Sequence, residues 1–379
     1  MKILKKILKR ILLTIGSLTI LLVIGYIVFV NFYPAFGGDV SDKLKATYEG
    51  SDNFRDGIFV NKKEVPEDHS FLETLQIARK FFFTEVPNGI PNENIEVQKV
   101  DSANVADYQG KTRLIWFGHS TFLLQMEGKT ILIDPMFGEV PAPHPWLGNE
   151  RFSEKLPIEV EKLPSIDAVI LSHDHYDHLD HKTILKLKDK VSRFYTPLAV
   201  GVHLKAWGVE ESRIVELDWW DIVNFGGLQF ICTPAQHFSG RKLNNRQSTL
   251  WSSWVIRSVS ESIFFSGDSG YGPHFKEIGD VYGPFDLAML ECGQYNESWP
   301  DVHMFPEETA QAGIDLRAKK IMPIHWGAFK LALHAWTDPV ERVTKKANEL
   351  QIPITIPEIG EPIFLKEDSS ENNWWWRKE

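Results

Sequence analysis

Residues 173–178 read His-Asp-His-Tyr-Asp-His and follow the apolar run 168–171, with Ser172 between them. Side chains two residues apart on a strand project to the same side, so a strand that ends in His-x-His sends both imidazoles toward one point. This turn offers three imidazoles and two carboxylates, Asp174 and Asp177, a ligand mixture that suits borderline-soft divalent ions such as zinc. An isolated His-x-His would be better interpreted as a solvated turn. Whether this turn binds a metal therefore depends on whether the rest of the chain supplies further ligands.

The same arrangement recurs further along the chain. Three segments each join a short apolar run to one potential ligand: 228–232 to His237, 262–265 to Asp268, and 321–324 to His325. Gly or Pro breaks each run, as expected of strands bounded by turns. Because strand ends meet at one edge of a layered α/β sheet, where ligands and metals bind, these side chains are expected to converge on the histidine-rich turn.

The ligands, in this order, resemble those of the metallo-β-lactamase superfamily, whose fold is an α/β protein of the αββα sandwich type. Within it the chain is most similar to the N-acyl-phosphatidylethanolamine-hydrolysing phospholipase D group and its bacterial relatives. Further similar stretches lie in matching order between about Thr112 and about Leu365: residues 116–121, 134–137, 216–220, 250–254, 283–287 and 306–308. The metal motif is specific to the superfamily, and these stretches point to the phospholipase D-like group.

The resemblance implies two divalent metal ions, with zinc as the default. It assigns the first ion to His173, His175 and His237, and the second to Asp177, His178 and His325, with Asp268 bridging. Two ions about 3.5–4 Å apart can clamp both oxygens of a displacement at phosphorus and lower the pKa of a bound water. A hydroxide bridging the ions would then be the nucleophile.

No side-chain nucleophile is evident in the sequence. The chain lacks a Gly-x-Ser-x-Gly elbow, and Cys232 and Cys292 have neither a catalytic context nor a disulfide framework. Given the ligand set that the resemblance implies, catalysis is assigned to Asp177, Asp268 and His303. His303, just before residues 304–307, is expected to bind substrate or act as an acid, and a helix-start residue is the alternative.

Two further residues are expected beside the ligands rather than among them. His119 follows a strand-like run and is interpreted as a buried supporting residue. Asp134 follows residues 130–133 and resembles the first-motif aspartate, which would orient metal ligands. The remaining histidines have no motif support: His69, His144, His181, His203, His274 and His334.

Residues 289–295 depart from the animal phospholipase D pattern. This segment is expected beside the metals, so Glu291, Gln294 and Tyr295 would reshape the substrate pocket. The alternative for Glu291 is a buried strand-end glutamate paired with a backbone group. The departure leaves the metal site intact but weakens the assignment of an acyl-ethanolamine substrate.

The N-terminus predicts a membrane anchor. Residues 1–10 hold five basic residues and no acid, and residues 11–30 are uncharged, long enough at 1.5 Å per residue to span about 30 Å of hydrocarbon. A cleaved signal peptide is the alternative, but its apolar region is usually shorter and residues 31–36 offer no Ala-x-Ala-like site. The positive-inside tendency predicts a cytoplasmic basic end and a catalytic part outside.

Charge narrows the choice of partner. The chain carries a net charge of −10, and its five basic N-terminal residues leave −15 for the remainder. An acidic catalytic part is poorly suited to a polyanion, so no nucleic-acid partner is expected. A phospholipid or another phosphodiester substrate in the anchoring membrane fits better. The sequence does not specify the oligomeric state.

The predicted organisation has five parts. They are the basic cytoplasmic end at 1–10, the transmembrane helix at 11–30, a connecting and capping region at 31–101, the metallo-hydrolase domain at 102–366 and a Trp-rich tail at 367–379. Helices are predicted at 70–83, with Ser70 as cap, and at 182–190, 306–318 and 339–350. The aromatic run 81–83 is assigned to the core, with contact to a bilayer as the alternative. The tail resembles an interfacial anchor, with packing on the domain or disorder as alternatives.

These observations predict a membrane-anchored, metal-dependent phosphodiesterase of the phospholipase D type. It would cleave an (N-acyl-)phosphatidylethanolamine-like lipid. The alternatives are a lactonase or soluble phosphoesterase of the same superfamily, and a non-catalytic, metal-sensing membrane protein. The complete ligand set argues against the last.

Overall fold

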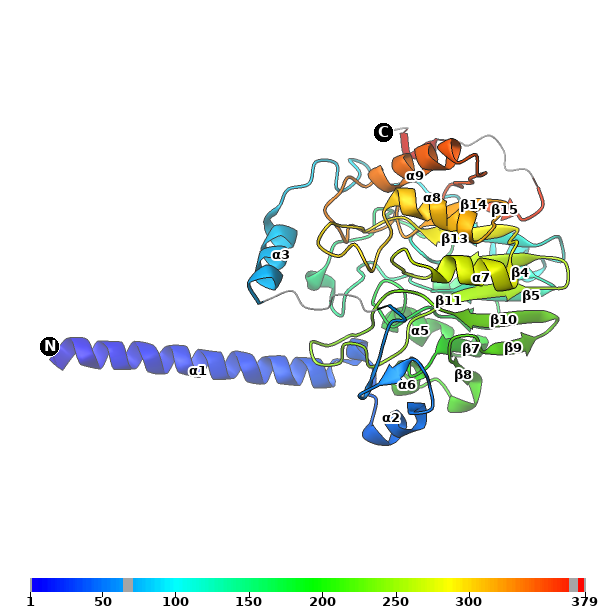
Figure 1. Ribbon diagram of the computed structural model, residues 1–379. Coiled ribbons are helices and arrows are strands. Elements are labelled where there is room, and N and C mark those ends of the chain that lie inside the picture. Colours follow the sequence, from blue (N-terminus) through cyan, green and yellow to red (C-terminus); the bar gives the residue numbers. More distant parts are fainter. Residues whose placement is uncertain (1, 64–70, 368–373, 378–379) are drawn as a thin grey trace.

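The computed structural model describes residues 2–63, 71–367 and 374–377 (Figure 1). Two β-sheets form its centre and helices flank them, which is the expected αββα arrangement. The helices are α1 (Lys2–Phe32), α2 (Asp42–Tyr48), α3 (Phe71–Phe83), α4 (Ser102–Ala106), α5 (His181–Leu187), α6 (Gly201–Ala206), α7 (His274–Tyr282), α8 (Pro306–Asp315) and α9 (Asp338–Glu349). Short 3-10 turns are η1 (Pro34–Phe36), η2 (Pro145–Leu147), η3 (Val160–Lys162), η4 (Glu211–Arg213) and η5 (Trp375–Arg377).

One sheet has seven strands in the order β15-β3-β4-β5-β6-β7-β8. They are β15 (Pro362–Phe364), β3 (Arg113–Trp116), β4 (Phe122–Met126), β5 (Lys129–Ile133), β6 (Ile166–Ile170), β7 (Val191–Pro197) and β8 (Ile214–Leu217). Strands β5 to β8 pair in parallel, so β5 and β6 end at the same edge.

The other sheet has six strands in the order β14-β13-β12-β11-β10-β9. They are β14 (Ile321–Ile324), β13 (Leu287–Glu291), β12 (Ser262–Phe265), β11 (Ser253–Arg257), β10 (Leu228–Thr233) and β9 (Ile222–Phe225). Because β11 runs antiparallel to both β10 and β12, and β12 to β14 are parallel, β10, β12 and β14 end at one edge. A separate ribbon pairs β1 (Phe54–Arg55) with β2 (Ile58–Phe59).

The strand sequences explain why both faces of the seven-stranded sheet are covered. In β5, Ile131 and Ile133 pack into the core between the sheets, whereas Leu132 joins a second core with Ile184 and Leu187 of α5. Alternate residues of a strand face opposite sides, and here both sides are apolar. The strand ends are therefore held on a layer that is buried on both faces.

The predicted elements are present with small shifts at their ends. The expected helix at 182–190 is α5, which begins at His181 because the Asp180 side chain accepts the Thr183 N–H as its cap. The helices expected at 306–318 and 339–350 are α8 and α9, the first ending three residues earlier, at Asp315. Ser70, the predicted cap of α3, lies outside the described residues.

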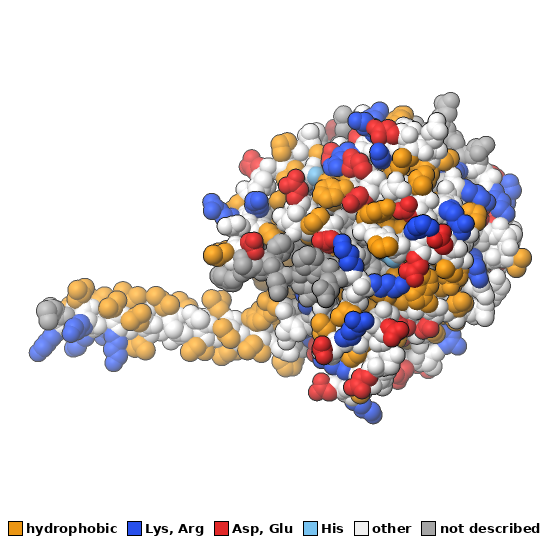
Figure 2. Space-filling view, viewed as in Figure 1, with side chains coloured by type: hydrophobic (Ala, Val, Ile, Leu, Met, Phe, Trp, Pro, Cys, Tyr) orange, Lys and Arg blue, Asp and Glu red, His pale blue; other side chains and the backbone are white. Residues whose placement is uncertain are grey.

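Helix α1 extends over 31 residues and projects from the body (Figures 1 and 2). Its side chains are exposed except near the end that joins the body, where Val30 is buried. By length and composition it could cross a membrane, a test that a signal sequence near an N-terminus also passes. Hydrophobic side chains follow its length, and the Lys and Arg side chains gather at its free end (Figure 2). It extends beyond the predicted 11–30 span because the basic first turns are also helical.

Two aromatic segments differ from or refine their predictions. Phe83, assigned to the core from the sequence, is 82% exposed, which corrects that assignment. At the tail, Trp375 and Trp376 are buried against the domain. Of the alternatives considered for the tail, the structure therefore shows packing on the domain. Trp375 stacks on Trp326 with ring centroids 5.4 Å apart, directly behind His325.

Candidate metal centre

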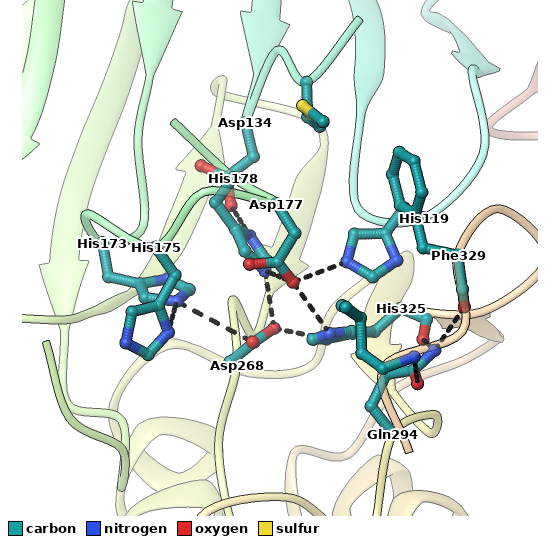
Figure 3. Close-up of polar contacts among 12 residues, drawn as sticks. His119, Asp134, His173, His175, Asp177, His178, Asp268, Gln294, His325 and Phe329 are labelled. Atoms are coloured by element: carbon teal, nitrogen blue, oxygen red, sulfur yellow. Dashed lines mark hydrogen bonds and ion pairs between the residues drawn. The ribbon is translucent and has the colours of Figure 1, made fainter. Parts of the chain in front are cut away.

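The predicted ligands meet at the common edge of the two sheets, and Figure 3 labels all of them except His237. The turn 173–178 follows β6, and the other three ligands follow β10, β12 and β14. Asp268 lies between two groups of side chains, with His173 and His175 on one side and His178, Asp177 and His325 on the other (Figure 3). The ends of four strands thus bring together residues that are up to 152 positions apart, from His173 to His325.

The first group contains His173, His175, His237 and Asp268, whose ligand atoms all lie within 4.8 Å of one another. His175 Nδ1 lies 2.9 Å from His173 Nε2 and 3.2 Å from His237 Nε2. Asp268 Oδ2 lies 3.8 Å from each of those two Nε2 atoms. This is the set that the resemblance assigns to the first ion.

The second group surrounds the other oxygen of Asp268. Asp268 Oδ1 lies 2.6 Å from His325 Nδ1 and 3.1 Å from His178 Nε2. Asp177 Oδ2 lies 3.4 Å from the Nε2 atoms of both histidines. Each oxygen of Asp268 therefore faces one group, as a bridging ligand would require.

Outer contacts determine which ring nitrogen faces the centre in three of the histidines. His178 Nδ1 donates to Asp134 Oδ2 at 2.7 Å, and His237 Nδ1 donates to the carbonyl of Val302 at 2.9 Å. Ser172 Oγ donates to Asp134, which leaves it to accept from His173 Nδ1 at 2.9 Å. In each case the Nε2 lone pair is directed at the centre, the arrangement typical of metal-binding histidines.

The donor set fits divalent cations. Within the described residues, the buried Nε2 atoms of His178 and His325 have no hydrogen-bond partner. His173 and His237 each donate their Nδ1 proton to an outer acceptor, so their Nε2 atoms carry lone pairs. Both of these Nε2 atoms face Nδ1 of His175. Buried lone pairs that converge beside two carboxylates need a positively charged partner, which a cation would supply. Imidazole nitrogens together with carboxylate oxygens are a ligand mixture that zinc accepts.

The electrostatics agree with this ligand chemistry for His173 and Asp268. Burial, and then the charge on His178, lowers the pKa of His173 well below its usual value, so that imidazole stays neutral. Burial raises the pKa of Asp268, but the charges on His178 and His325 outweigh it and hold that pKa well below its usual value. Neutral imidazoles and ionised carboxylates are the forms that bind metals. Burial lowers the pKa of His178, but the charges on Asp268 and Asp177 outweigh it and raise that pKa well above its usual value, so a metal that binds there must displace a proton.

His119 supports the second group more closely than the sequence suggested. Its Nε2 lies 2.9 Å from Asp177 Oδ2, its ring is fully buried, and it falls within ligand distance of Asp177, His178 and His325. Its backbone N–H donates to Trp326 and its carbonyl accepts from the His325 N–H. His119 therefore links β3 to the segment that carries His325.

His303 lies beside both groups and is held by a buried glutamate. Its Nδ1 lies 2.8 Å from Glu291 Oε1, while Glu291 Oε2 accepts the Ser269 N–H at 2.6 Å. One ring nitrogen of His303 comes within 4.8 Å of ligand atoms of Asp268 and His325. Burial and the charge of Asp268 raise the pKa of Glu291 well above its usual value, and burial lowers that of His303.

A pocket of about 730 Å³ opens over the centre. His175, Asp177, Asp268, His303 and His325 form its floor, and α3 contributes Glu73, Gln76, Ile77 and Lys80 to its wall. Phe238, Arg246, Gln294, Trp299 and Leu331 complete much of the lining. A volume in the range of about 300–1,000 Å³ is typical of ligand sites. The lining of this pocket is mixed, because Glu73, Glu297 and Asp301 lie among its apolar side chains.

Three residues of segment 289–295, which departs from the animal phospholipase D pattern, take three different positions. Gln294 lines the pocket, and its side chain is bound by the carbonyl of Phe329 and the N–H of Leu331. Glu291 lies behind His303, and Tyr295 points away, toward Asp338 and Arg342 of α9. The expectation that all three shape the pocket directly is met by Gln294 alone.

Other polar residues of the motif region have structural partners. Asp174, offered by the sequence as a possible ligand, faces away and binds His203 Nε2 at 3.2 Å and the Gly240 N–H at 2.8 Å. His274 binds Ser269 Oγ at 3.1 Å, and His334 Nε2 accepts the Gln294 N–H at 3.0 Å. The contacts of Ser172 and of the Val302 carbonyl with the ligand histidines were not predicted from the sequence. Of the two, only Ser172 carries a sequence signal, which is its position beside His173.

Comparisons with known proteins agree with this geometry. A model described as the beta-lactamase superfamily domain matches residues 129–326. An uncharacterised protein of Mycobacterium tuberculosis is 37% identical over 351 residues, which cover 90% of this chain and 92% of that protein. An N-acyl-phosphatidylethanolamine-hydrolysing phospholipase D of Caenorhabditis elegans is 31% identical over 247 residues, covering 61% of this chain and 69% of that protein.

One solved structure supports the fold alone. It is a metallo hydrolase from the archaeon Ignicoccus hospitalis, which is 21% identical and has a TM-score of 0.52. The match covers 68% of this chain and 100% of that chain.

Proposed function

Because this chain belongs to the beta-lactamase superfamily of metal-dependent hydrolases, we propose that it cleaves a phosphodiester in a membrane phospholipid, in the manner of a phospholipase D. The observation that carries the proposal is the position of Asp268, with one carboxylate oxygen toward each group of ligands. The sequence similarity to a phospholipase D that hydrolyses N-acyl-phosphatidylethanolamine supports the same class of substrate.

In this proposal His173, His175 and His237 would hold the first ion and Asp177, His178 and His325 the second, with Asp268 contributing one carboxylate oxygen to each group. When bound, the ions supply an activated water and neutralise charge on the phosphoryl oxygens. Outer contacts through Ser172, Asp134 and Val302 keep the imidazole lone pairs directed at the ions before substrate arrives.

The substrate would enter the pocket with its phosphate above Asp268. Arg246 and Lys80 are the cationic side chains of the lining, and Phe238, Ile77 and Leu331 are apolar ones suited to acyl chains. The water oxygen forms a bond to phosphorus, and the bond from phosphorus to the headgroup oxygen breaks. His303, whose Nδ1 is held by Glu291 and whose pKa is lowered by burial, would accept the proton that the attacking water loses and pass it to the leaving oxygen.

The position of α3 supports a substrate in the bilayer. Leu72 and Leu75 of α3 are 67% and 56% exposed, while its Glu73, Gln76, Ile77 and Lys80 line the pocket. Helix α3 lies on the side of the body toward which α1 projects (Figure 1). An apolar outer face beside a membrane anchor is suited to contact with the interface.

The basic end of α1 sets the proposed orientation. Five Lys and Arg residues among residues 2–10 favour a cytoplasmic N-terminus, which places the catalytic part outside the cytoplasm. Protease added to intact cells should then degrade the catalytic part. Its complete protection, with degradation after the membrane is opened, would reverse the orientation.

The substrate proposal is tested on full-length protein in mixed micelles of N-acyl-phosphatidylethanolamine, phosphatidylethanolamine and phosphatidylcholine. Products are identified by mass spectrometry in water enriched in oxygen-18, with and without chelator. We expect phosphatidic acid that carries one labelled oxygen, released together with the free headgroup alcohol, and no product when chelator is present. Release of fatty acid instead, or cleavage that survives chelation, would contradict the proposal.

A further inference from the structure

The segment that follows α1 is fixed to the body through Arg241. This side chain is 3% exposed, and its Nε and Nη2 donate to the carbonyl of Ala35 in η1 at 3.0 and 2.7 Å. Trp207 Nε1 donates to the neighbouring Pro34 carbonyl at 2.7 Å, and Lys242 pairs with Asp39 at 2.6 Å. The exit of the candidate membrane helix is therefore a docked part of the structure.

The other end of the same guanidinium holds the metal-ligand turn. Arg241 Nη1 donates to the carbonyls of Asp174 at 2.5 Å and Leu179 at 2.9 Å. These two residues flank residues 175–178, which contain three of the proposed ligands. By binding both ends of this turn, one planar group fixes its width, a task for which the rigid fork of arginine is suited.

Further contacts tie the loop that carries Arg241 to the same turn. Tyr176 Oη donates to the Arg241 carbonyl at 2.6 Å, and its ring lies 4.0 Å from the guanidinium carbon. The Gly240 N–H donates to Asp174 Oδ1 at 2.8 Å. The loop also contains His237, so Arg241 connects two ligand-bearing segments with the exit of α1.

We propose that Arg241 is a positioning residue that makes the segment 33–39 part of the support of the metal centre. The anchor exit and the ligand turn then form one unit, and a change in how the segment sits alters how firmly the metals are held. This inference rests on the metal-binding part of the proposed function and is independent of the substrate.

Glycines in the segment allow the proposal to be tested without touching Arg241. A Cβ at Gly38 would lie 2.4 Å from the carbonyl oxygen of Val202, so Gly38→Ala must shift the segment away from α6. A Cβ at Gly25 in α1 would meet nothing within 4 Å, so Gly25→Ala is the matched control. Arg213 donates to the carbonyls of Lys188 and Val191, which makes Arg213→Lys the matched control for Arg241→Lys.

The experiment uses full-length, detergent-solubilised protein loaded with Co²⁺, whose visible absorption reports ligand geometry. Loss of Co²⁺ to a chelator is timed for each variant. We expect Arg241→Lys to release the ion about tenfold faster, the usual size of the effect for an outer support of a metal ligand. Gly38→Ala should also speed the release of Co²⁺. In the double variant, the release rate should be lower than the product of the two single-variant fold-changes predicts. Both controls should stay within about twofold of the parent.

A second readout needs no metal. In the metal-free protein, amide hydrogen exchange over residues 174–179 should be faster in Arg241→Lys and Gly38→Ala than in their controls. Should Arg241→Lys not fold, the comparison of Gly38→Ala with Gly25→Ala decides. Equal release rates in all variants, or fully multiplicative effects in the double variant, would overturn the role of Arg241. Failure of the parent protein to retain Co²⁺ would instead contradict the proposed function.

Discussion

Nδ1 of His303 lies 2.8 Å from Oε1 of Glu291, and this contact leaves the other ring nitrogen available to the pocket above the metal ligands. Glu291 lies in the segment 289–295, where the chain departs from the animal phospholipase D pattern, and His303 lies eight residues beyond it. A buried carboxyl that orients a histidine is a common arrangement for proton transfer.

His303→Gln should therefore slow the reaction most where the leaving group is poor. We expect a loss of about 10²–10³-fold on a phospholipid, whose leaving alcohol needs a proton, within the usual contribution of general acid–base catalysis. On bis(p-nitrophenyl) phosphate, whose leaving group departs without a proton, the loss should be under about tenfold. Equal losses on both substrates, measured as kcat, would assign His303 to binding or structure instead.

The apolar outer face of α3 should matter only when the substrate is in a bilayer. Replacing both Leu72 and Leu75 with Glu removes two exposed apolar side chains, each worth about 1.5–3 kcal/mol if buried in lipid. Hydrolysis of lipid in vesicles should fall about tenfold or more, whereas hydrolysis of a short-chain monomeric substrate should not change. Val281→Glu, on the exposed face of α7, is the control. A similar loss on both substrates would place α3 in catalysis or folding.

Trp375 should contribute to stability through its packing on Trp326. Because the ring is buried, Trp375→Ala should lower the free energy of unfolding by about 3 kcal/mol. Trp374 is half-exposed beside it, so Trp374→Ala should cost less than about 1 kcal/mol. Urea denaturation of both variants measures the difference. Equal small losses would show that the tail is not part of the folded unit in solution.

His274 should make the fold sensitive to acid. Burial, and then the charge on Lys62, lowers the pKa of His274 to about 3, from 6.5 in the unfolded chain. Between these values the unfolded state binds a proton that the folded state does not, so stability falls as pH decreases from about 6.5 toward 3. The slope is up to about 1.4 kcal/mol per pH unit for one group. His274→Gln should flatten the pH dependence of urea denaturation by that amount, and an unchanged slope would contradict the assignment.

The convergence of the predicted ligands could be read from the sequence because each belongs to a local pattern. His237, Asp268 and His325 each follow an apolar run of strand length, and the runs at 262–265 and 321–324 are strands with those bounds. Once the strands are aligned in their sheets, their ends lie at one edge and bring these side chains together. Local capping also explains the start of α5 at His181.

The residues that the sequence did not reveal act through contacts between distant segments. Val302 contributes a backbone carbonyl, which carries no sequence signal, and Arg241 binds carbonyls of Ala35, Asp174 and Leu179. Asp174 was offered as a ligand on its residue type alone, whereas alternation places it on the side opposite His173 and His175, where it binds His203 and Gly240. For α3, periodicity predicts an apolar stripe but not what covers it, and the polar face of the helix lines the pocket.

The central claim is that Asp268 bridges two metal ions required for hydrolysis. The most direct test is the metal content of the purified protein, measured by mass spectrometry for the parent chain and for Asp268→Asn, together with chelator-sensitive turnover. We predict about two divalent ions per chain in the parent, and the loss of at least one ion and of turnover in Asp268→Asn. A parent chain that is active with one ion or none, or an Asp268→Asn variant with full turnover, would contradict the two-metal account.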